Sequence, residues 1–375
     1  MGDEQVNILV TGAEGFIGKN LIHRLRYMDG MNILAYDIGS DPKDLAEYAQ
    51  SADIVYHLAG INRPKREEEF MEGNRDFVRT VLDMLRRAGN TGAKIVVSSS
   101  IQAALDNPYG HSKKAGEELV AAFSAEHGNP AVIYRFPNVF GKWCRPNYNS
   151  AVATFCHNIA RSLPITVNDP ETVLNLVYID DVVDELISCM DSCEHIRDGY
   201  GYVPCVYEKK LGDISDLIYS FEKTRHDLSL PDFSDAFEKK LYSTYLSYLD
   251  EDDFSYPLIM HEDARGSFTE FLKTDDRGQV SVNISHPGVV KGNHWHNTKN
   301  EKFLVIKGEG LIRLRKVGCD KVTEYHVSGR HLQVVDIPCG YTHSIQNVGN
   351  DDMATVMWVN EIYDPGRGDT FHEEV

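Results

Sequence analysis

Tyr109 and Lys113 stand four residues apart in the segment Asn107-Pro-Tyr-Gly-His-Ser-Lys113. A proline favours the first turn of a helix, and residues at i and i+4 lie on one face of a helix. The Lys113 ammonium can therefore lie near the Tyr109 phenol and lower its pKa from the ordinary value of about 10. Such a phenol can exchange a proton during redox chemistry between a carbonyl and an alcohol. Two unrelated surface side chains are the alternative interpretation.

A glycine-rich turn follows a predicted buried strand near the N-terminus. Strand 6–10 leads into Gly12-Ala-Glu-Gly15-Phe-Ile-Gly18, after which apolar residues recur at helical spacing. In a strand–turn–helix unit, glycines let backbone N–H groups approach a pyrophosphate at the helix N-terminus. We therefore predict that Gly12, Gly15 and Gly18 bind a dinucleotide.

Asp37 ends the next predicted strand, 32–36. An acidic side chain about 20 residues after a glycine turn of this kind binds the ribose hydroxyls of the adenosine. Its carboxylate would repel a 2′-phosphate, so Asp37 by itself favours NAD over NADP. A polar residue that simply ends a strand is the alternative.

Predicted strands and helices alternate as far as the strand 131–136 and imply a doubly wound parallel sheet. Together with the motifs above, the sequence resembles the extended short-chain dehydrogenase/reductase superfamily of nucleotide-sugar epimerases, dehydratases and reductases. The resemblance covers about residues 6–240. It also rests on three segments: His57-Leu-Ala-Gly60, Arg135-Phe-Pro-Asn-Val-Phe-Gly141 and Tyr178-Ile-Asp-Asp-Val182.

This resemblance implies a Rossmann-type fold and assigns roles to particular residues. Tyr109 is expected to donate a proton. Lys113 is expected to bind the nicotinamide ribose, in addition to its effect on Tyr109. Ser100, with Ser99 as the alternative, is expected to hydrogen-bond the substrate carbonyl.

The resemblance further places substrate phosphates near Asn138. In the loop 141–149, Lys142 and Arg145 could bind a diphosphate, although basic loop residues can also be simply solvated.

The last third of the chain has a different pattern. Short predicted strands separated by turn signals cover 279–284, 301–306, 311–315, 332–337 and 354–359. Evenly spaced short strands indicate a sandwich or a barrel. We therefore predict an α/β domain at 1–245 and an all-β domain at 250–375, with the acidic link 250–253 at the start of the second.

Four residues of the all-β part could bind a metal ion. His294 and His296 are alternate residues of a predicted strand and can share one face, while Glu301 and His343 can return on other strands. Imidazoles with one carboxylate suit zinc, iron, manganese, nickel or copper. Histidines that are merely half-buried are the alternative.

Both halves of this pattern resemble the two metal-binding motifs of the cupin superfamily, H-x-H-x(4)-E and P-x-G-x-x-H-x(3)-N. The resemblance covers about residues 255–375 and implies a β-barrel with four metal ligands, His294, His296, Glu301 and His343. The segment 291–294 is also similar to the histidine-bearing loop of dTDP-sugar 3,5-epimerases, so His294 could instead be a base. Lys302, Tyr341 and a metal-bound water are further candidates for the epimerisation base.

The combination of both parts resembles the bifunctional capsular-polysaccharide enzymes of the CapF type. These make UDP-2-acetamido-2,6-dideoxy-L-talose on the route to UDP-N-acetyl-L-fucosamine. Local matches include Ser98-Ser-Ser-Ile-Gln-Ala103, Phe140-Gly-Lys-Trp-Cys144 and Gly266-Ser-Phe-Thr-Glu-Phe271. The resemblance implies Zn²⁺, a UDP-linked 4-keto-6-deoxy amino sugar, a homodimer, and NADPH as the reductant, with NADH possible because of Asp37.

The chemistry implies an order of two steps. A 4-ketone acidifies the proton at C3, and a metal ion could stabilise the enolate while C3 inverts. Reduction at C4 removes the ketone, so we expect the C-terminal domain to epimerise before the N-terminal domain reduces.

One alternative places both steps at Tyr109, as in GDP-fucose synthase-like enzymes, with the C-terminal domain as a scaffold. Another is a ligand-sensing regulator, which retention of Tyr109 and Lys113 disfavours.

Composition limits the classes of function. The 375 residues are 42% hydrophobic and 25% charged, which is ordinary for a globular protein, and the formal net charge is −19. This charge argues against unaided binding to nucleic acid or to an anionic membrane surface. No secretion signal or membrane-spanning run is visible, and seven cysteines occur without C-x-x-C. We therefore expect reduced thiols, no membrane insertion and a cytoplasmic location.

Overall fold

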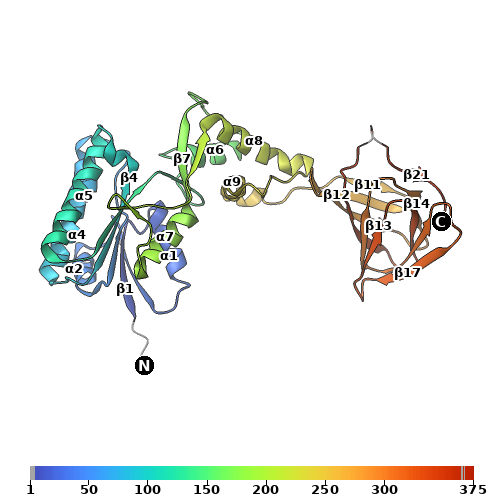
Figure 1. Cartoon of the computed structure of the whole chain (residues 1–375), viewed down its shortest axis with the longest axis horizontal. Coiled ribbons are helices and arrows are strands. Elements are labelled where there is room, and N and C mark those ends of the chain that lie inside the picture. The colour runs from blue at the N-terminus through green and yellow to red at the C-terminus, as the bar shows by residue number, and fades with distance from the viewer. Residues whose placement is uncertain (1–4, 365, 367) are drawn as a thin grey trace. The chain divides into compact units, whose positions relative to one another are not determined.

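The structure is a computed structural model that describes residues 5–364, 366 and 368–375. The chain divides into two compact units, of which the first holds residues 1–219 and 233–249. The second unit holds residues 220–232 and 250–375. Figure 1 shows helices and strands mixed in the first unit, and a second unit built from strands.

The first unit is organised around a seven-stranded sheet in the order β2-β1-β3-β4-β5-β9-β8. All of its strand pairs are parallel except the antiparallel pair of β8 and β9. The strands are β1 (Val6–Thr11), β2 (Met31–Tyr36), β3 (Ile54–His57), β4 (Lys94–Ser100), β5 (Ala131–Phe136), β8 (Ile196–Arg197) and β9 (Tyr200–Gly201). The central strands are rich in Val, Ile and Leu, as expected when helices cover both faces.

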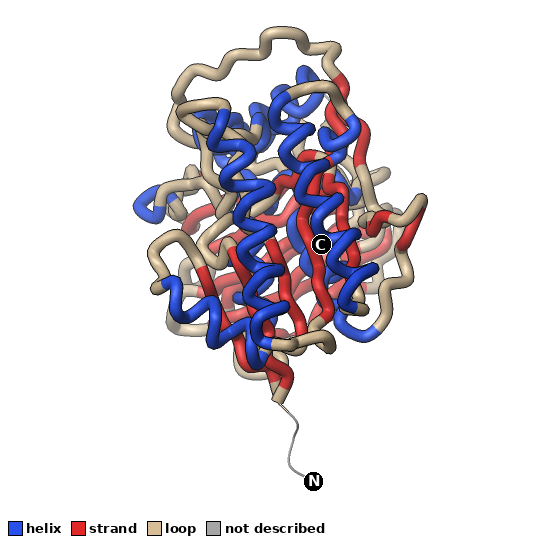
Figure 2. The backbone as a smooth tube through the Cα atoms, turned by 90° about the vertical axis from the view of Figure 1, so that its left-hand side faces the viewer, coloured by secondary structure: helices blue, strands red, loops and turns tan. Residues whose placement is uncertain are grey.

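Helices cover both faces of this sheet. Buried residues of α1 (Phe16–Leu25) and α7 (Ile179–Asp191) pack on one face. Those of α2 (Pro42–Ser51), α4 (Phe77–Ala88) and α5 (Pro108–His127) pack on the other, and Figure 2 shows helices lying across the strands. The predicted doubly wound, Rossmann-type fold is thereby confirmed.

The first unit also contains a smaller sheet and further helices. A three-stranded sheet in the order β10-β7-β6 joins β10 (Tyr207–Lys210), β7 (Val173–Tyr178) and β6 (Asn138–Phe140). Its other α-helices in the described part of the chain are α3 (Glu68–Met71), α6 (Ala151–Ile159) and α9 (Ala236–Leu246), and α8 (Leu211–Asp227) begins in the first unit and ends in the second. None of the helices in the described part of the chain combines the length and the apolar character that a membrane span needs.

The expectation of reduced thiols holds for five of the seven cysteines and is wrong for one pair. The structure joins Cys189 to Cys193 in a disulfide, with the two Cα atoms 4.5 Å apart, whereas we expected reduced thiols. The pair is close because Cys189 lies in the last turn of α7 and Cys193 follows that helix by two residues.

The second unit contains two antiparallel sheets. The six-stranded sheet has the order β11-β12-β13-β20-β15-β18, and the five-stranded sheet has the order β17-β16-β19-β14-β21. The six-stranded sheet contains β11 (Met260–Asp263), β12 (Gly266–Thr274), β13 (Gly278–Ser285), β15 (Glu301–Lys307), β18 (Val334–Ile337) and β20 (Met353–Val359). The five-stranded sheet contains β14 (Val290–Trp295), β16 (Glu309–Lys316), β17 (Val322–Ser328), β19 (Tyr341–Asn347) and β21 (Phe371–His372).

Apolar residues from both sheets share one core, which includes Phe303 of β15 with Ile312 of β16 and Ile345 of β19. The two sheets therefore pack face to face, as in a sandwich or a barrel. The predicted all-β character is confirmed, and four of the five predicted strands lie within β13, β15, β16 and β20. The fifth, 332–337, is a strand only from Val334 onward.

Candidate active site and metal centre

The glycine turn lies at the point where the strand order of the main sheet reverses. From β1 the chain passes to β2 on one side, and β3 lies on the other side of β1. Gly12 has a φ of 71°, and an added Cβ would lie 2.7 Å from the backbone nitrogen of Ala59. At Gly18 an added Cβ would lie 2.1 Å from the Gly12 oxygen, so the turn packs closely on the helix. A glycine turn at such a switch point is where the pyrophosphate of a dinucleotide would lie.

Asp37 lies beside that turn. One carboxylate oxygen accepts a hydrogen bond from the Glu14 backbone nitrogen at 2.7 Å, and the other accepts from the Ile38 nitrogen at 2.7 Å. The structure therefore brings Asp37 to the glycine turn, where the ribose of an adenosine would lie.

Tyr109 lies in the first turn of α5, as its sequence predicts. The Asn107 side chain caps this helix by accepting a hydrogen bond from the Gly110 nitrogen at 2.7 Å, and Pro108 is the first helical residue. The Ser100 hydroxyl, at the end of β4, is close enough to the Tyr109 phenol to act on its pKa. Ser99 instead donates a hydrogen bond of 2.5 Å to the buried Glu117. Of the two candidate serines, the structure brings Ser100 to Tyr109.

The pKa of Tyr109 differs from the sequence prediction in direction. Burial raises this pKa, and the nearby Ser100 hydroxyl opposes the increase only in part. Lys113 was expected to lower it, but the Lys113 ammonium donates a hydrogen bond to the Ser98 carbonyl at 2.7 Å. Burial also lowers the pKa of Lys113 to about 8, against the attraction of Glu117. Near neutral pH the phenol is therefore protonated in this structure.

A buried ion pair behind Ser99 was not foreseen. Arg135 of β5 donates hydrogen bonds of 2.9 and 2.6 Å to the two carboxylate oxygens of Glu117. Glu117 is only 4% exposed. The signal in the sequence is its position four residues after Lys113, on the same face of α5.

Asn74 was also missed by the sequence analysis. It lies in a π-helical turn, Glu72–Asp76, and its buried amide donates to the Ile61 carbonyl at 2.8 Å and to the Ser112 hydroxyl at 3.0 Å. Its side-chain oxygen accepts from the Ile61 nitrogen at 2.8 Å. A void of about 10 Å³, enough for roughly one water, is lined in part by Asn74, Lys113 and Glu117. No local pattern in the sequence marks Asn74.

The predicted substrate-side residues each contact a neighbour. Lys142 pairs with Asp180 at 2.5 Å, so its charge is partly compensated. The Arg145 guanidinium lies 4.9 Å from the centre of the Tyr148 ring. Asn138 is exposed, and its amide donates a hydrogen bond of 3.3 Å to the backbone oxygen of residue 175.

The four predicted metal ligands lie together in the second unit. One donor atom of each of His294, His296, Glu301 and His343 falls within 4.8 Å of those of the other three. The Nε2 atom of His343 is 3.0 Å from Glu301 Oε2, and that of His296 is 3.8 Å from the same oxygen. The ring centres of His294 and His343 are 4.5 Å apart. Thus β14, β15, β19 and the turn after β14 together form one cluster.

A bulge in β14 directs His294 towards His343. The register with β19 shifts between Gly292 and His294, so that His294 lies opposite His343. Gly292 has a φ of 101° and Asn293 a φ of 57°, conformations that glycine and asparagine tolerate best. An added Cβ on Gly292 would lie 2.7 Å from the His343 backbone oxygen, so only glycine fits there without displacing β19.

The donor set fits a transition metal ion. His296 Nε2 and His343 Nδ1 are buried and make no hydrogen bond within the described part of the chain. Buried polar atoms without a partner are rare and call for an explanation such as a bound ion. Burial, together with the nearby rings of His343 and His296, lowers the pKa of His294 to about 4. At neutral pH this imidazole is uncharged, which is the form that binds metals.

The structure separates the candidate bases. Lys302 follows Glu301 on β15, so its side chain lies on the opposite face of the sheet, where it pairs with Asp336. Tyr341 precedes His343 by two residues on β19 and so shares its face. His372 was not considered, yet β21 pairs with β14 so that His372 lies opposite His294, with ring centres 6.4 Å apart. Only strand pairing reveals this neighbour.

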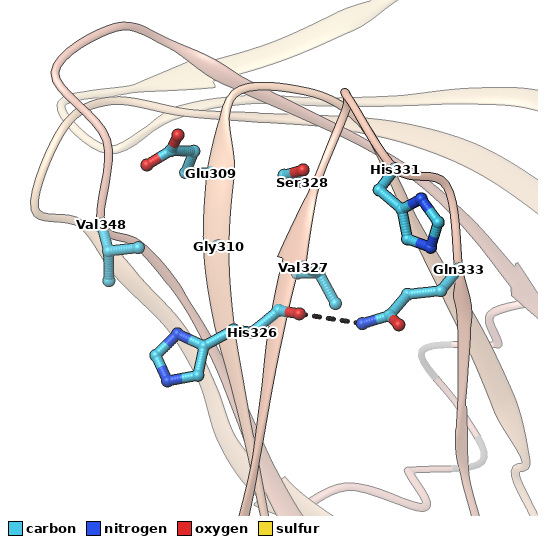
Figure 3. Close-up of a pocket in the computed structure, with 8 residues that line it drawn as sticks. All are labelled: Glu309, Gly310, His326, Val327, Ser328, His331, Gln333 and Val348. Carbon is cyan, nitrogen blue, oxygen red and sulfur yellow. Dashed lines mark hydrogen bonds between the residues drawn. The ribbon is translucent and has the colours of Figure 1, made fainter.

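The second unit also has a pocket of about 230 Å³ at the ends of β16 and β17 (Figure 3). Its lining contains none of the predicted metal ligands. The Gln333 amide crosses the wall of the pocket and donates a hydrogen bond of 2.8 Å to the His326 backbone oxygen. The sequence predicted no site at this position.

Two family models match separate parts of the chain. Residues 8–203 match the NAD dependent epimerase/dehydratase family, and residues 261–371 match the polysaccharide biosynthesis C-terminal domain. Because the first match spans more than half of the chain, the protein belongs to the NAD dependent epimerase/dehydratase family.

The chain is also similar to particular proteins over nearly its whole length. The structure of CapF from Staphylococcus aureus has 53% sequence identity and a TM-score of 0.94, with 99% of this chain and 100% of that chain covered. A second CapF structure, with the inhibitor 3-isopropenyl-tropolone, has 48% identity and a TM-score of 0.89 over the same coverage. A UDP-2-acetamido-2,6-beta-L-arabino-hexul-4-ose reductase from Pseudomonas aeruginosa is 42% identical, with 98% of each chain covered. The predicted resemblance to the CapF type is therefore confirmed.

Proposed function

We propose that this protein is a bifunctional nucleotide-sugar enzyme. Residues 250–375, which we propose to form a cupin-type barrel, invert C3 of a UDP-2-acetamido-2,6-dideoxy-4-hexulose. Residues 1–245 then reduce the C4 ketone with NADPH to give UDP-2-acetamido-2,6-dideoxy-L-talose, on the route to UDP-N-acetyl-L-fucosamine for capsule or O-antigen. The observation that carries the proposal is that one chain holds both a Ser100–Tyr109 pair and a separate cluster of three histidines and Glu301.

For the epimerisation, a 4-ketone makes the neighbouring C3 proton acidic. His294, His296, Glu301 and His343 would hold Zn²⁺, which supplies Lewis acidity when it is bound. Tyr341 shares the face of His343 and could exchange a proton with C3, whereas Lys302 points away. The tropolone named with the related CapF structure supports a metal, because a tropolone has adjacent hydroxyl and carbonyl oxygens that chelate metal ions.

For the reduction, the nicotinamide supplies a hydride to C4. The Ser100 hydroxyl would hydrogen-bond the carbonyl oxygen, and Tyr109 would give its phenolic proton to that oxygen as the alcohol forms. The raised pKa of Tyr109 fits this direction, because a proton donor has to carry its proton at neutral pH. Lys113 would bind the nicotinamide ribose. The relative from Pseudomonas aeruginosa, named as a reductase of a hexul-4-ose, supports this second step.

The reductant and the oligomer are further parts of the proposal. The CapF type implies NADPH, but the Asp37 carboxylate beside the glycine turn would also suit NADH. Comparison of kcat/KM for the two reductants decides between them. We also propose a homodimer, which light scattering tests as a particle of twice the chain mass.

Product analysis tests the proposed function. Purified protein, the UDP-linked 4-keto sugar and NADPH are incubated together, and NMR determines the configuration of C3 and C4 in the product. We expect a product inverted at C3 and carrying an alcohol at C4. A product that is reduced at C4 but retains its C3 configuration would remove the epimerase half of the proposal. Absence of any turnover would remove both halves.

A further inference from the structure

A segment near the C-terminus crosses the strands that carry the metal cluster. β21 pairs with β14, with Phe371 opposite Trp295 and His372 opposite His294. The Glu373 backbone nitrogen donates a hydrogen bond of 3.0 Å to the Asn293 oxygen. The segment is also tied to β19, because the Thr342 hydroxyl donates to the Glu373 carbonyl at 2.6 Å. Residues 369–373, here called the C-terminal clasp, therefore depend on the geometry of the cluster strands.

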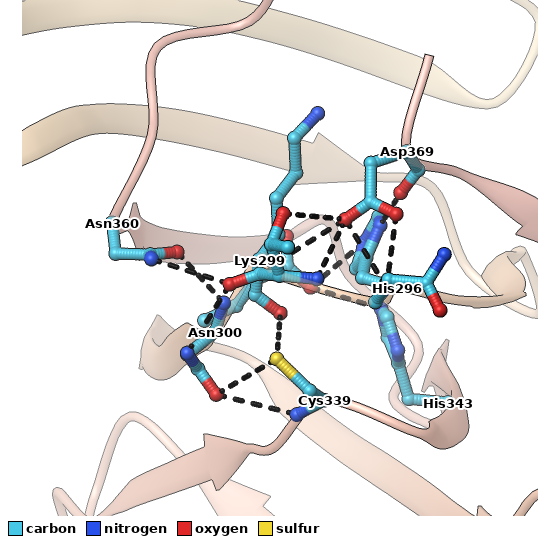
Figure 4. A network of polar contacts seen from close by, with 10 residues as sticks. His296, Lys299, Asn300, Cys339, His343, Asn360 and Asp369 are labelled. Atoms are coloured by element: carbon cyan, nitrogen blue, oxygen red, sulfur yellow. Dashed lines mark hydrogen bonds and ion pairs between the residues drawn. The ribbon is translucent and has the colours of Figure 1, made fainter. Parts of the chain in front are cut away.

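Asp369 fixes the turn that joins two of the predicted ligands. Its carboxylate accepts hydrogen bonds from the backbone nitrogens of Asn297 and Thr298, each at 2.9 Å, and from the Thr298 hydroxyl at 3.0 Å. Figure 4 shows Asp369 in this network of polar contacts with His296 and Lys299. Hydrogen bonds of this kind hold the pKa of the Asp369 carboxyl well below its usual range, against the effect of burial. The Asp369 carboxylate thus anchors the start of the turn between His296 and Glu301, while Asn360 holds its end by accepting a hydrogen bond from the Asn300 nitrogen at 2.7 Å.

The backbone of the same residue orients a ligand. The Asp369 carbonyl contacts His296 Nδ1. A carbonyl oxygen can only accept a hydrogen bond, so Nδ1 must carry the proton. Nε2 then keeps its lone pair, and this atom is buried without a hydrogen bond, 3.8 Å from Glu301 Oε2. His296 is therefore held in the tautomer and orientation that a metal ligand needs.

We infer that Asp369 is a positioning residue, and that the C-terminal clasp preorganises His296 for metal binding. The inference rests on the proposed metal site. Asp369 contacts no metal itself; it acts through the 297–299 turn and through His296 Nδ1. Loss of an outer partner of this kind weakens metal binding by about 10- to 100-fold.

Zinc affinity tests the inference. The affinity of the full chain is measured by competition with a chromogenic chelator for wild type, Asp369→Ala and the control Asp336→Ala, whose carboxylate pairs with Lys302 on the outer face. Asp369→Ala keeps the backbone carbonyl but removes the carboxylate that holds this carbonyl segment against the 297–299 turn, so the carbonyl is no longer fixed on His296 Nδ1. We therefore expect Asp369→Ala to bind zinc about 10- to 100-fold more weakly, and Asp336→Ala to bind it like wild type. A purely structural role would lower the stability of the metal-free protein and leave zinc affinity unchanged, which would overturn the inference. No zinc binding by wild type would instead remove the proposed metal site.

Hydrogen exchange on wild type avoids dependence on a variant that folds poorly. If metal and clasp are coupled, zinc should slow exchange of the Glu373 amide, which donates to Asn293 in the neighbouring strand. Exchange of this amide at the same rate with and without zinc would overturn the inference.

Discussion

The two candidate sites of this chain are assembled in different ways. In the first unit, Ser100, Tyr109 and Lys113 come from one strand end and the helix that follows it, within 14 consecutive residues. In the second unit, the cluster draws on β14, β15 and β19 and on both sheets, over 50 residues of sequence. The first geometry therefore depends on a helix and its cap, whereas the second depends on strand register and on distant segments such as the clasp.

Replacing Tyr109 with Phe should give the largest difference between the two activities. Loss of the phenolic proton should lower NADPH oxidation by about 10²- to 10⁴-fold, the usual worth of a general acid. Exchange of the C3 proton should stay within roughly twofold of wild type, since the cluster does not include this residue. NADPH oxidation is followed by absorbance, and C3 exchange by NMR. Loss of both activities would show that the sites are not separable.

His343→Ala should have the opposite effect, with loss of epimerisation and retention of reduction. His343 is a proposed ligand and is buried, so its removal should weaken zinc binding by more than the roughly 100-fold expected for a residue that only hydrogen-bonds a ligand. It should also abolish exchange of the C3 proton. Reduction of a sugar that is already inverted at C3 should continue. Zinc content and both rates are measured on the same preparation. Unchanged C3 inversion in this variant would favour the alternative in which both steps occur at Tyr109.

The stability of the first unit should depend on the ion pair of Glu117 and Arg135. In Arg135→Met the Glu117 carboxylate stays buried without its partner, which costs about 3–5 kcal/mol of unfolding free energy. The exposed pair of Arg86 and Asp83 provides a control, since Arg86→Met should cost at most about 1 kcal/mol. Urea unfolding followed by circular dichroism compares the two. Equal effects would mean that the buried pair is not important for stability.

In the first unit, the positions of the site residues could be predicted from the sequence, but their pKa values could not. The positions of Tyr109, Ser100 and the glycine turn follow from local rules, because a proline, a cap and a strand end fix them. The pKa of Tyr109 could not be predicted, since it depends on how deeply the folded chain buries the phenol and on where Lys113 points.

In the second unit, the sequence predicted the four clustered residues but not their supports. His294, His296, Glu301 and His343 stand in motifs, and the structure brings them together. Asp369 is 72 residues from Asn297 in the turn after β14, and His372 pairs with His294 of β14 itself; no spacing rule connects either residue to its partner. Long-range strand pairing of this kind is decided by the whole sheet.

A substitution at Gly292 tests whether the metal cluster depends on the register between β14 and β19, with a smaller expected effect than the loss of a ligand. In Gly292→Ala the new Cβ would press on the His343 backbone oxygen, and the φ of 101° would be strained, at a cost of about 1–3 kcal/mol. Zinc binding should weaken as β14 and β19 shift. Gly288→Ala is the matched control, because its φ of 78° brings similar strain with open space around the Cβ. If both variants bind zinc equally well, the bulge does not set the cluster geometry.

The smallest effect is expected for Lys302→Ala. The side chain lies on the outer face of β15 and pairs with Asp336, away from the cluster. Both C3 exchange and NADPH oxidation should stay within roughly twofold of wild type. A large loss of C3 exchange, measured by NMR, would instead identify Lys302 as the base.

Proton exchange in D2O tests the central claim of two sites acting in order. The 4-keto UDP sugar is incubated with zinc-loaded wild-type protein, first without NADPH and then with it, and NMR follows deuterium at C3. We expect deuterium to enter C3 before any NADPH is added, and reduction at C4 to follow its addition. Direct reduction on adding NADPH, with no earlier deuterium at C3, would contradict it.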